Sequence, residues 1–315
     1  MRALITGATG MIGSYLMERA AWHPYFSQVD GVHHTFDREE QPGLHYCDLA
    51  DDIAVERLLL KLKPDVIFHL AGNPVIKDSC MPSYMHCANT IATHNLLEAC
   101  RPGTKFIFAS SHMVYGSSGG QFERTVRPET TYAITKFAAE NLVKMYRDQK
   151  EKIDGISLRL VANCGANSRH GIIHDLVEKL SAKPETLEVF GFDPGSHKPF
   201  MYAGDTADAM LTAGVSKSLA GQSVYDLGNE HGITVKEIAK IVMDEMKISR
   251  PLFWSGNKHT WSGDQKFVIS DSIAFKKRFP DWKPKHETSR AAIQAAVRDI
   301  LQCKRKSALQ VAAAT

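Results

Sequence analysis

Short apolar segments alternate with amphipathic segments along the first 160 residues of the chain. Five apolar segments of five to seven residues are expected to form strands, at 2–6, 28–33, 65–71, 105–110 and 155–159. The segments between them have helical periodicity and predict helices at 11–21, 51–63, 84–100 and 131–150. Apolar runs this short are typical of parallel strands buried on both faces. We therefore expect an α/β fold with a Rossmann-type, doubly wound parallel sheet.

The pattern loosens beyond about residue 160, where loops rich in Gly and Pro separate shorter elements. Helices are expected at 172–182, 206–216 and 234–246, and a strand at 223–227 is expected to return to the main sheet. This organisation predicts a sheet domain over residues 1–165 and a smaller C-terminal α/β lobe over residues 166–303. Residues 304–315, which are basic and then rich in Ala, are expected to form a disordered tail.

Composition narrows the class of protein. With 315 residues and 43% hydrophobic residues, the chain can bury sizeable cores, which excludes disordered proteins and small disulfide scaffolds. The net charge is +3 without a block of like charges, so we expect neither a nucleic-acid partner nor a membrane partner. The six cysteines have no metal-ligand spacing, which predicts reduced thiols, no metal site and a cytoplasmic location. No apolar run is long enough for a signal peptide or a membrane span.

A glycine-rich turn follows the first predicted strand and precedes the first predicted helix. Gly7, Gly10 and Gly13 are spaced by three residues, and Met11 and Ile12 begin the helix. Glycine lets the backbone approach a pyrophosphate, while the helix N-terminus offers free N–H donors. The alternative is an ordinary glycine-rich turn, but the flanking strand and helix favour a dinucleotide site. The spacing resembles that of the short-chain dehydrogenase/reductase superfamily.

The end of the second predicted strand bears on the choice of cofactor. Asp30 lies inside this strand, so the strand ends at His33 and His34, with Arg38 nearby. Imidazoles do not reproduce the carboxylate that binds ribose hydroxyls and rejects a 2′-phosphate. We therefore expect NAD(P) as cofactor, with NADP favoured over NAD. Asp48 and Leu49 match the superfamily's adenine-contacting pair; the alternative for Asp48 is a helix N-cap.

Three residues in order have the chemistry of proton transfer at an alcohol carbon. Ser111 lies at the C-terminal end of a buried strand, where open α/β sheets bind ligands. Tyr132 and Lys136 follow at i and i+4 on one helix face. The ammonium favours the phenolate and so lowers the tyrosine pKa, while the serine hydroxyl can hold the same substrate oxygen. The alternative, a core tyrosine beside a solvated lysine, is disfavoured by the order of the motifs.

Over roughly residues 1–300 the chain resembles the extended short-chain dehydrogenases/reductases that act on nucleotide sugars, the NAD-dependent epimerase/dehydratase group typified by UDP-galactose 4-epimerase. The matching residues are Gly7, Gly10, Gly13, His69 to Gly72, Asn89, Asn95 to Ala99, Ser111 to Gly116, Tyr132, Lys136, Arg159 to Gly165, Phe200 to Asp205 and Tyr225 to Gly228. The resemblance implies that Ser111 holds the substrate hydroxyl and that Tyr132 is the acid/base. It further implies that Lys136 tunes Tyr132 and binds the nicotinamide ribose, and that the cofactor is also lined by Leu70, Ala71, Gly72 and Asn89. It implies, too, a homodimer through a four-helix bundle of helices 84–100 and 131–150.

The residues after Ser111 bear on the reaction. Related 4,6-dehydratases and decarboxylases have an acidic residue there, whereas this chain has His112 and Met113. A nucleotide-sugar 4,6-dehydratase is therefore disfavoured, and a C4 epimerase or 4-keto reductase is expected. His112 is interpreted either as a second acid/base or as a residue that lines the pocket.

The lobe departs from the family pattern where a nucleotide diphosphate would bind. Ala162 replaces a usual Asn, Asn163 lies one residue later, and Lys198 replaces an Arg. Asn163, Arg169 and Lys198 are candidate substrate-binding residues, and Lys179 is a further candidate. These departures keep open a dehydrogenase of a small sugar or hydroxy acid, and a non-catalytic cofactor-sensing protein remains a third alternative.

Overall fold

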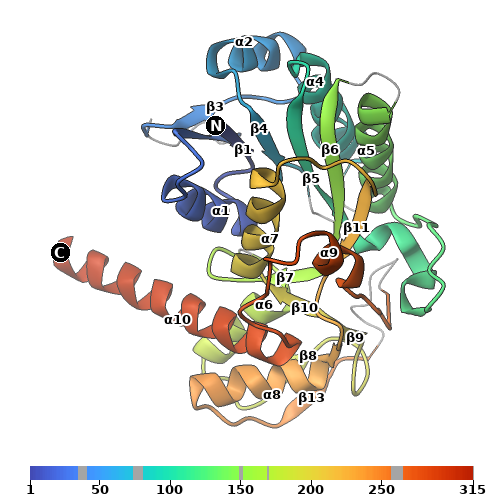
Figure 1. The fold of residues 1–315 in the computed structure, drawn as a ribbon. Coiled ribbons are helices and arrows are strands. Elements are labelled where there is room, and N and C mark those ends of the chain that lie inside the picture. The colour runs from blue at the N-terminus through green and yellow to red at the C-terminus, as the bar shows by residue number, and fades with distance from the viewer. Residues whose placement is uncertain (35–40, 74–80, 149–151, 169, 257–264, 315) are drawn as a thin grey trace.

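A seven-stranded, entirely parallel sheet forms the centre of the computed structural model (Figure 1). Its strands are β1 (Arg2–Thr6), β2 (Gln28–His33), β3 (Leu44–Tyr46), β4 (Val66–His69), β5 (Thr104–Ser111), β6 (Ile153–Leu160) and β11 (Val224–Leu227). Their order across the sheet is β3-β2-β1-β4-β5-β6-β11. The structure describes residues 1–34, 41–73, 81–148, 152–168, 170–256 and 265–314. The expected doubly wound sheet is confirmed, and β11 is the strand expected to return to it.

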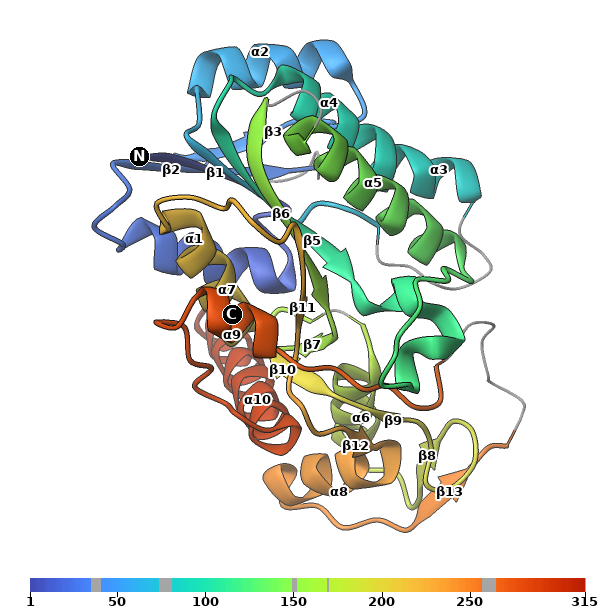
Figure 2. The same ribbon diagram turned by 45° about the vertical axis from the view of Figure 1, so that its right-hand side comes forward.

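Helices cover both faces of this sheet (Figure 2). One face carries α2 (Asp52–Leu62), α4 (Ala92–Ala99) and α5 (Thr131–Asp148), and the other carries α1 (Met11–Ala21) and α7 (Ala203–Val215). Alternation along the strands explains the two layers: in β1, Leu4 packs toward α2 and α4, whereas Ala3 and Ile5 pack toward α1 and α7. The helix expected at 84–100 is composite, with α3 (Pro82–His86) and a π-helical turn, η1 (Cys87–Ile91), preceding α4.

The C-terminal lobe has its own apolar core below the sheet. Its elements are β7 (Ala162–Cys164), α6 (Ile172–Ser181), β8 (Leu187–Val189), β9 (His197–Lys198), β10 (Phe200–Tyr202), β12 (Ile233–Thr234), α8 (Val235–Met246), β13 (Leu252–Trp254) and α10 (Ser289–Ala314). Between these, α7, β11 and α9 (Ile273–Arg278) belong to the sheet layers. A 3-10 segment, η2 (His112–Gly120), connects β5 to the region before α5.

The structure also differs from the predictions at the C-terminus and at the end of β4. Residues 304–314 continue α10 instead of forming a disordered tail, because Ala, Leu, Gln, Lys and Arg favour helix and Lys304 pairs with Glu178 at 2.7 Å. The fourth strand ends at His69, so Leu70 to Gly72 lie in the loop that follows β4. Among the described residues, no helix is long and apolar enough to cross a membrane.

Candidate active site

The glycine-rich turn between β1 and α1 leaves no room for a side chain at Gly7 or Gly13. Gly7 has a φ of 67°, and a Cβ on Gly13 would lie 2.1 Å from the Gly7 carbonyl oxygen. Gly10 is the N-cap of α1 and provides no side-chain cap, so the first N–H groups of the helix, which include those of Met11 and Ile12, keep no intrahelical partner. This bare turn at a helix N-terminus fits a pyrophosphate, as the sequence predicts.

The loop after β4 lies against this turn and against α5. A Cβ on Gly7 would lie 2.8 Å from the Ala71 nitrogen, and one on Gly72 would lie 2.7 Å from Asn89 Oδ1 and 3.4 Å from Lys136 Nζ. Asn89 Nδ2 donates to Thr135 Oγ1 on α5 at 3.0 Å. The residues expected to line the cofactor, which also include half-buried Leu70, therefore lie along one edge of the sheet.

The opposite end of the expected cofactor site lies at β2. His33 is buried against the Tyr46 ring, and exposed His34 lies 3.6 Å from Asp48 Oδ2. Asp30 is 5% exposed and bonds to His45 Nε2 at 2.8 Å, so it does not face a ribose.

The two residues expected to contact adenine differ in their surroundings. The N-cap of α2 is Asp51, which accepts from Ala54 N at 3.0 Å, so the N-cap interpretation of Asp48 is wrong. Asp48 instead accepts from Ala50 N at 2.9 Å, and Leu49 is buried in the core.

Ser111, Tyr132 and Lys136 lie together at the C-terminal ends of the central strands. The Ser111 hydroxyl lies close enough to the Tyr132 phenol to act on the pKa of Tyr132. Lys136 Nζ donates to the Ala109 carbonyl on β5 at 2.9 Å and lies 4.8 Å from the centre of the Phe108 ring. The expected catalytic residues are thus brought together by β5 and the first two turns of α5.

Burial dominates the electrostatics of these groups. It raises the pKa of Tyr132 above its ordinary value, and the nearby Ser111 hydroxyl partly opposes this. The shift is therefore opposite in direction to the lowering by Lys136 that the sequence predicts. Burial also lowers the pKa of Lys136 to about 8, so this ammonium remains mostly protonated at neutral pH.

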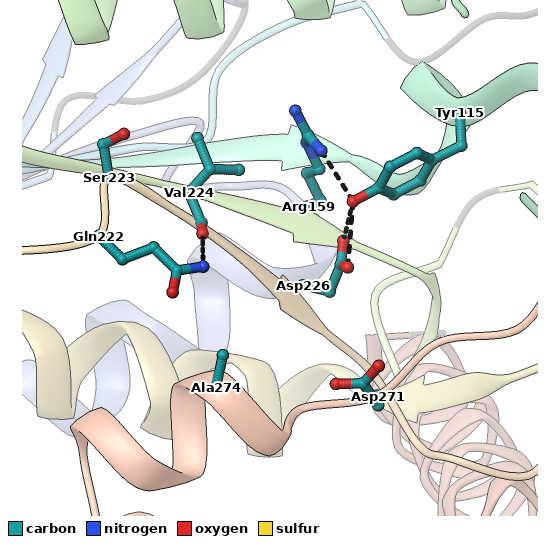
Figure 3. A pocket seen from close by; sticks show the side chains of 8 residues that line it. All are labelled: Tyr115, Arg159, Gln222, Ser223, Val224, Asp226, Asp271 and Ala274. Carbon is teal, nitrogen blue, oxygen red and sulfur yellow. Dashed lines mark hydrogen bonds between the residues drawn. The ribbon is translucent and has the colours of Figure 1, made fainter. Parts of the chain in front are cut away.

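The sequence analysis missed a charged network around Tyr115 and Arg159. Figure 3 shows the part in which Arg159 and Asp226 both bond to the Tyr115 hydroxyl. Buried Glu140 accepts from Arg159 Nε at 3.0 Å, and Arg159 Nη1 donates to the Tyr115 hydroxyl at 2.7 Å. Tyr115 donates to Asp226 at 3.0 Å, and Arg124 pairs with the same carboxylate at 2.8 Å. This network borders a cavity of about 330 Å³, lined by Tyr115, Arg159, Gln222, Ser223, Val224, Asp226, Asp271 and Ala274. The position of Glu140, four residues after Lys136, is a signal in the sequence that points to it.

His112 lies at the start of η2 and is 3% exposed. Its ring packs on Tyr115, with 4.9 Å between ring centres. Burial and the nearby Arg124 lower its pKa to about 4, while the Ile269 carbonyl acts in the opposite direction. Neither ring nitrogen reaches hydrogen-bond geometry with any group in the described part of the chain. A neutral imidazole in this position favours the pocket-lining interpretation of His112.

The candidate substrate residues of the lobe do not converge on one point. Asn163 Nδ2 donates to the Val161 carbonyl at 2.9 Å, and Asn163 Oδ1 accepts from Thr206 Oγ1 at 2.6 Å, so its amide connects β7 to α7. Lys179 bonds to the Glu188 carbonyl at 3.0 Å, and Lys198 lies in β9. Arg169 lies outside the described residues.

The comparisons with known proteins agree with this geometry. The pattern of the NAD dependent epimerase/dehydratase family matches residues 3–228. The chain is 28% identical over 258 residues to the uncharacterised UDP-glucose epimerase YtcB of Bacillus subtilis (strain 168), covering 76% of this chain and 81% of that protein. It is 28% identical over 242 residues to the UDP-glucose 4-epimerase of Mycolicibacterium smegmatis, covering 68% and 73% of the two chains.

Solved structures give the same result at the level of the fold. A UDP-galactose 4-epimerase superposes with a TM-score of 0.78 at 25% identity, covering 96% of this chain and 99% of that one. The UDP-glucose 4-epimerase of Thermus thermophilus, solved with NAD, has a TM-score of 0.81 at 24% identity and covers 95% and 99%. With its glycine-rich turn and the Ser111, Tyr132 and Lys136 set in place, the chain belongs to the NAD-dependent epimerase/dehydratase family and is an enzyme of the extended short-chain dehydrogenase/reductase type.

Proposed function

We propose that the protein is an NAD(P)-dependent nucleotide-sugar C4 epimerase or 4-keto reductase. The observation that carries this proposal is the grouping of Ser111 at the end of β5 with Tyr132 and Lys136 on one face of α5, where Lys136 Nζ donates to the Ala109 carbonyl at 2.9 Å, at the sheet edge that also holds the glycine-rich turn. The UDP-glucose epimerases among the relatives support a nucleotide sugar as substrate. A 4,6-dehydratase stays disfavoured, because neither His112 nor Met113 supplies the carboxylate that elimination requires.

The proposed mechanism assigns the proton to Tyr132 and the substrate oxygen to Ser111. When bound, the nicotinamide cofactor supplies a hydride acceptor and donor. Because burial raises its pKa, the Tyr132 phenol is protonated near neutral pH and suits delivery of a proton to a sugar oxygen. In the reverse direction, the Tyr132 phenolate takes the proton from the sugar hydroxyl. The phenolate needs a positive charge nearby, which Lys136 provides from the same face of α5. Ser111 holds the C4 oxygen against the phenol.

The test combines a substrate panel with a Tyr132→Phe variant. Wild-type protein is incubated with UDP-, GDP- and dTDP-sugars, and the products are separated by chromatography while reduced nicotinamide is followed by absorbance. We expect interconversion of C4 epimers without net cofactor turnover, or reduction of a 4-keto sugar with stoichiometric turnover. The variant should lose about 10²- to 10⁴-fold in kcat. Full activity of Tyr132→Phe would refute the assignment.

A dehydrogenase of a small sugar or hydroxy acid is the second candidate. The observation in its favour is that Asn163 is occupied by Thr206 and Lys179 by Glu188, so both candidate diphosphate partners are already engaged. Nucleoside diphosphates distinguish the two functions: they should raise the Tm of a nucleotide-sugar enzyme through binding to the native state. A Tm that none of UDP, GDP and dTDP changes would favour the small-substrate dehydrogenase.

NADP is proposed as the preferred form of the cofactor. The proposal is supported by His33 and His34 at the end of β2 and by the burial of Asp30, whereas the Asp48 carboxylate beside His34 acts against it. Thermal-shift titration with each cofactor measures the preference. We expect a lower Kd for NADP and a reversal of the preference in a His34→Asp variant; tighter binding of NAD to the wild type would overturn the proposal.

A homodimer in the cytoplasm is also proposed. The dimer is supported by apolar side chains on the outer faces of two neighbouring helices: Tyr84 on α3 is 52% exposed and Ile134 on α5 is 53% exposed. The location is supported by the spacing of the cysteines in the sequence.

A further inference from the structure

Three consecutive residues of β5 contact three residues of α5 that are spaced by one helical turn. The pairs are Tyr132 with Ser111, Lys136 with the Ala109 carbonyl at 2.9 Å, and Glu140 with the Ser110 hydroxyl at 3.0 Å. The first two pairs contain the residues to which the proposed function assigns the chemistry. The third contains Glu140, to which neither the sequence analysis nor the mechanism gives a role.

Glu140 is the most constrained of the three helix residues. Its side chain is 5% exposed, and one carboxylate oxygen accepts from both Ser110 Oγ and Arg159 Nε at 3.0 Å. The other oxygen accepts from Arg159 Nη2. Ser110 and Arg159 are register partners on the neighbouring strands β5 and β6. A single carboxylate thus connects α5 to two central strands, one residue before Ser111.

A contribution to protein stability does not by itself explain the buried ion pair between Glu140 and Arg159. A buried Arg–carboxylate pair usually stabilises a fold no better than apolar residues of similar volume do, because desolvation of the two charges offsets their attraction. What the pair provides is geometry: two parallel N–H···O bonds fix the direction of the carboxylate as well as its distance. The pair therefore fixes both the rotation of α5 about its axis and its position along β5.

We propose that Glu140 is a positioning residue for the reaction, which together with Arg159 and Ser110 holds α5 in the register that places the Tyr132 phenol beside the Ser111 hydroxyl. This inference rests on the proposed function of Tyr132. Tyr132 lies two helical turns from Glu140 on the same face, so a shift of the helix at Glu140 moves the phenol relative to the sugar oxygen. A misplacement of about 1 Å costs about 100-fold in rate.

The experiment compares Glu140→Gln and Ser110→Ala with a matched control. Glu245 makes the same two-bond contact with Arg298, at 2.7 and 2.8 Å, but this more exposed pair joins α8 to α10 in the lobe. Glu245→Gln is therefore the control for loss of such a contact away from the site. We expect Glu140→Gln to lower kcat about 10- to 100-fold with KM changed by less than about twofold, and Ser110→Ala to lower kcat less. The limb of the kcat pH profile that reports the acid/base should shift in Glu140→Gln and stay in place in the control.

A double variant separates positioning from folding. Glu140→Met with Arg159→Met replaces the ion pair with apolar side chains, so we expect its Tm to return close to that of the wild type while kcat stays low. Recovery of kcat together with Tm would show a structural role only and overturn the proposal. So would wild-type kcat and an unchanged pH profile in a folded Glu140→Gln protein. A fully active Tyr132→Phe protein would instead refute the proposed function, which keeps the two failures distinguishable.

Discussion

At the scale of single residues, the burial of His112 predicts how the stability of the protein depends on pH. Its pKa is about 4 in the folded protein, below the ordinary value near 6.5, so the unfolded chain binds more protons between these two pH values. Stability therefore falls as the pH falls through this window, by up to about 1.4 kcal/mol per pH unit for this group. We expect a His112→Asn variant to lose less stability than the wild type between pH 6.5 and pH 4, as measured by urea unfolding.

The same variant decides between the two interpretations of His112. His69 has an even lower pKa, about 3, and stays in the variant, so the pH dependence of stability should weaken rather than vanish. Because a neutral imidazole does not titrate above pH 6, the kcat/KM profile between pH 6 and pH 9 should keep its shape. The loss of a limb near pH 6 to 7 in the variant would show that His112 acts as a second acid/base instead.

Single residues differ in how far the sequence predicts their surroundings. Tyr132 and Lys136 are four residues apart on one helix, so local spacing places them on one face and the structure agrees. Glu140 continues the same spacing, yet its partner Arg159 lies on β6, and a sequence pattern does not show which strand pairs with which. The surroundings of Asn163 are hidden from the sequence for a similar reason: Thr206, whose hydroxyl bonds to its amide, lies 43 residues away on α7.

At the scale of elements, the length of a helix or strand decides how well the sequence predicts its bounds. The bounds of β1, β2 and α1 match the expected ranges, since each element carries enough apolar positions for its period to show. The short strands of the lobe were missed. They contain two or three residues and exist through distant partners, as β9 does by pairing with β12. Two candidate substrate residues, Asn163 in β7 and Lys198 in β9, lie in such strands, so a sequence pattern does not show what surrounds them.

At the scale of the whole molecule, the outer surface of α3 and α5 bears on assembly. Ile134 and Tyr84 are exposed apolar side chains on the outer surface of α5 and α3, where the proposed four-helix bundle would form. A stable dimer interface buries about 1,200–2,000 Å² in total, and a carboxylate at its apolar centre is costly to desolvate. We therefore expect the wild type to be a dimer by light scattering after gel filtration, and Ile134→Glu to be a monomer.

The chain offers a matched control for this substitution. Ile53 lies on α2, on the same face of the sheet, and is 55% exposed compared with 53% for Ile134. It lies outside the helices proposed for the bundle, so Ile53→Glu should leave the mass of the particle unchanged. If the wild type is a monomer at micromolar concentration, the bundle does not form. If Ile53→Glu dissociates the dimer and Ile134→Glu does not, the interface lies on α2, and the resemblance to the family does not extend to its assembly.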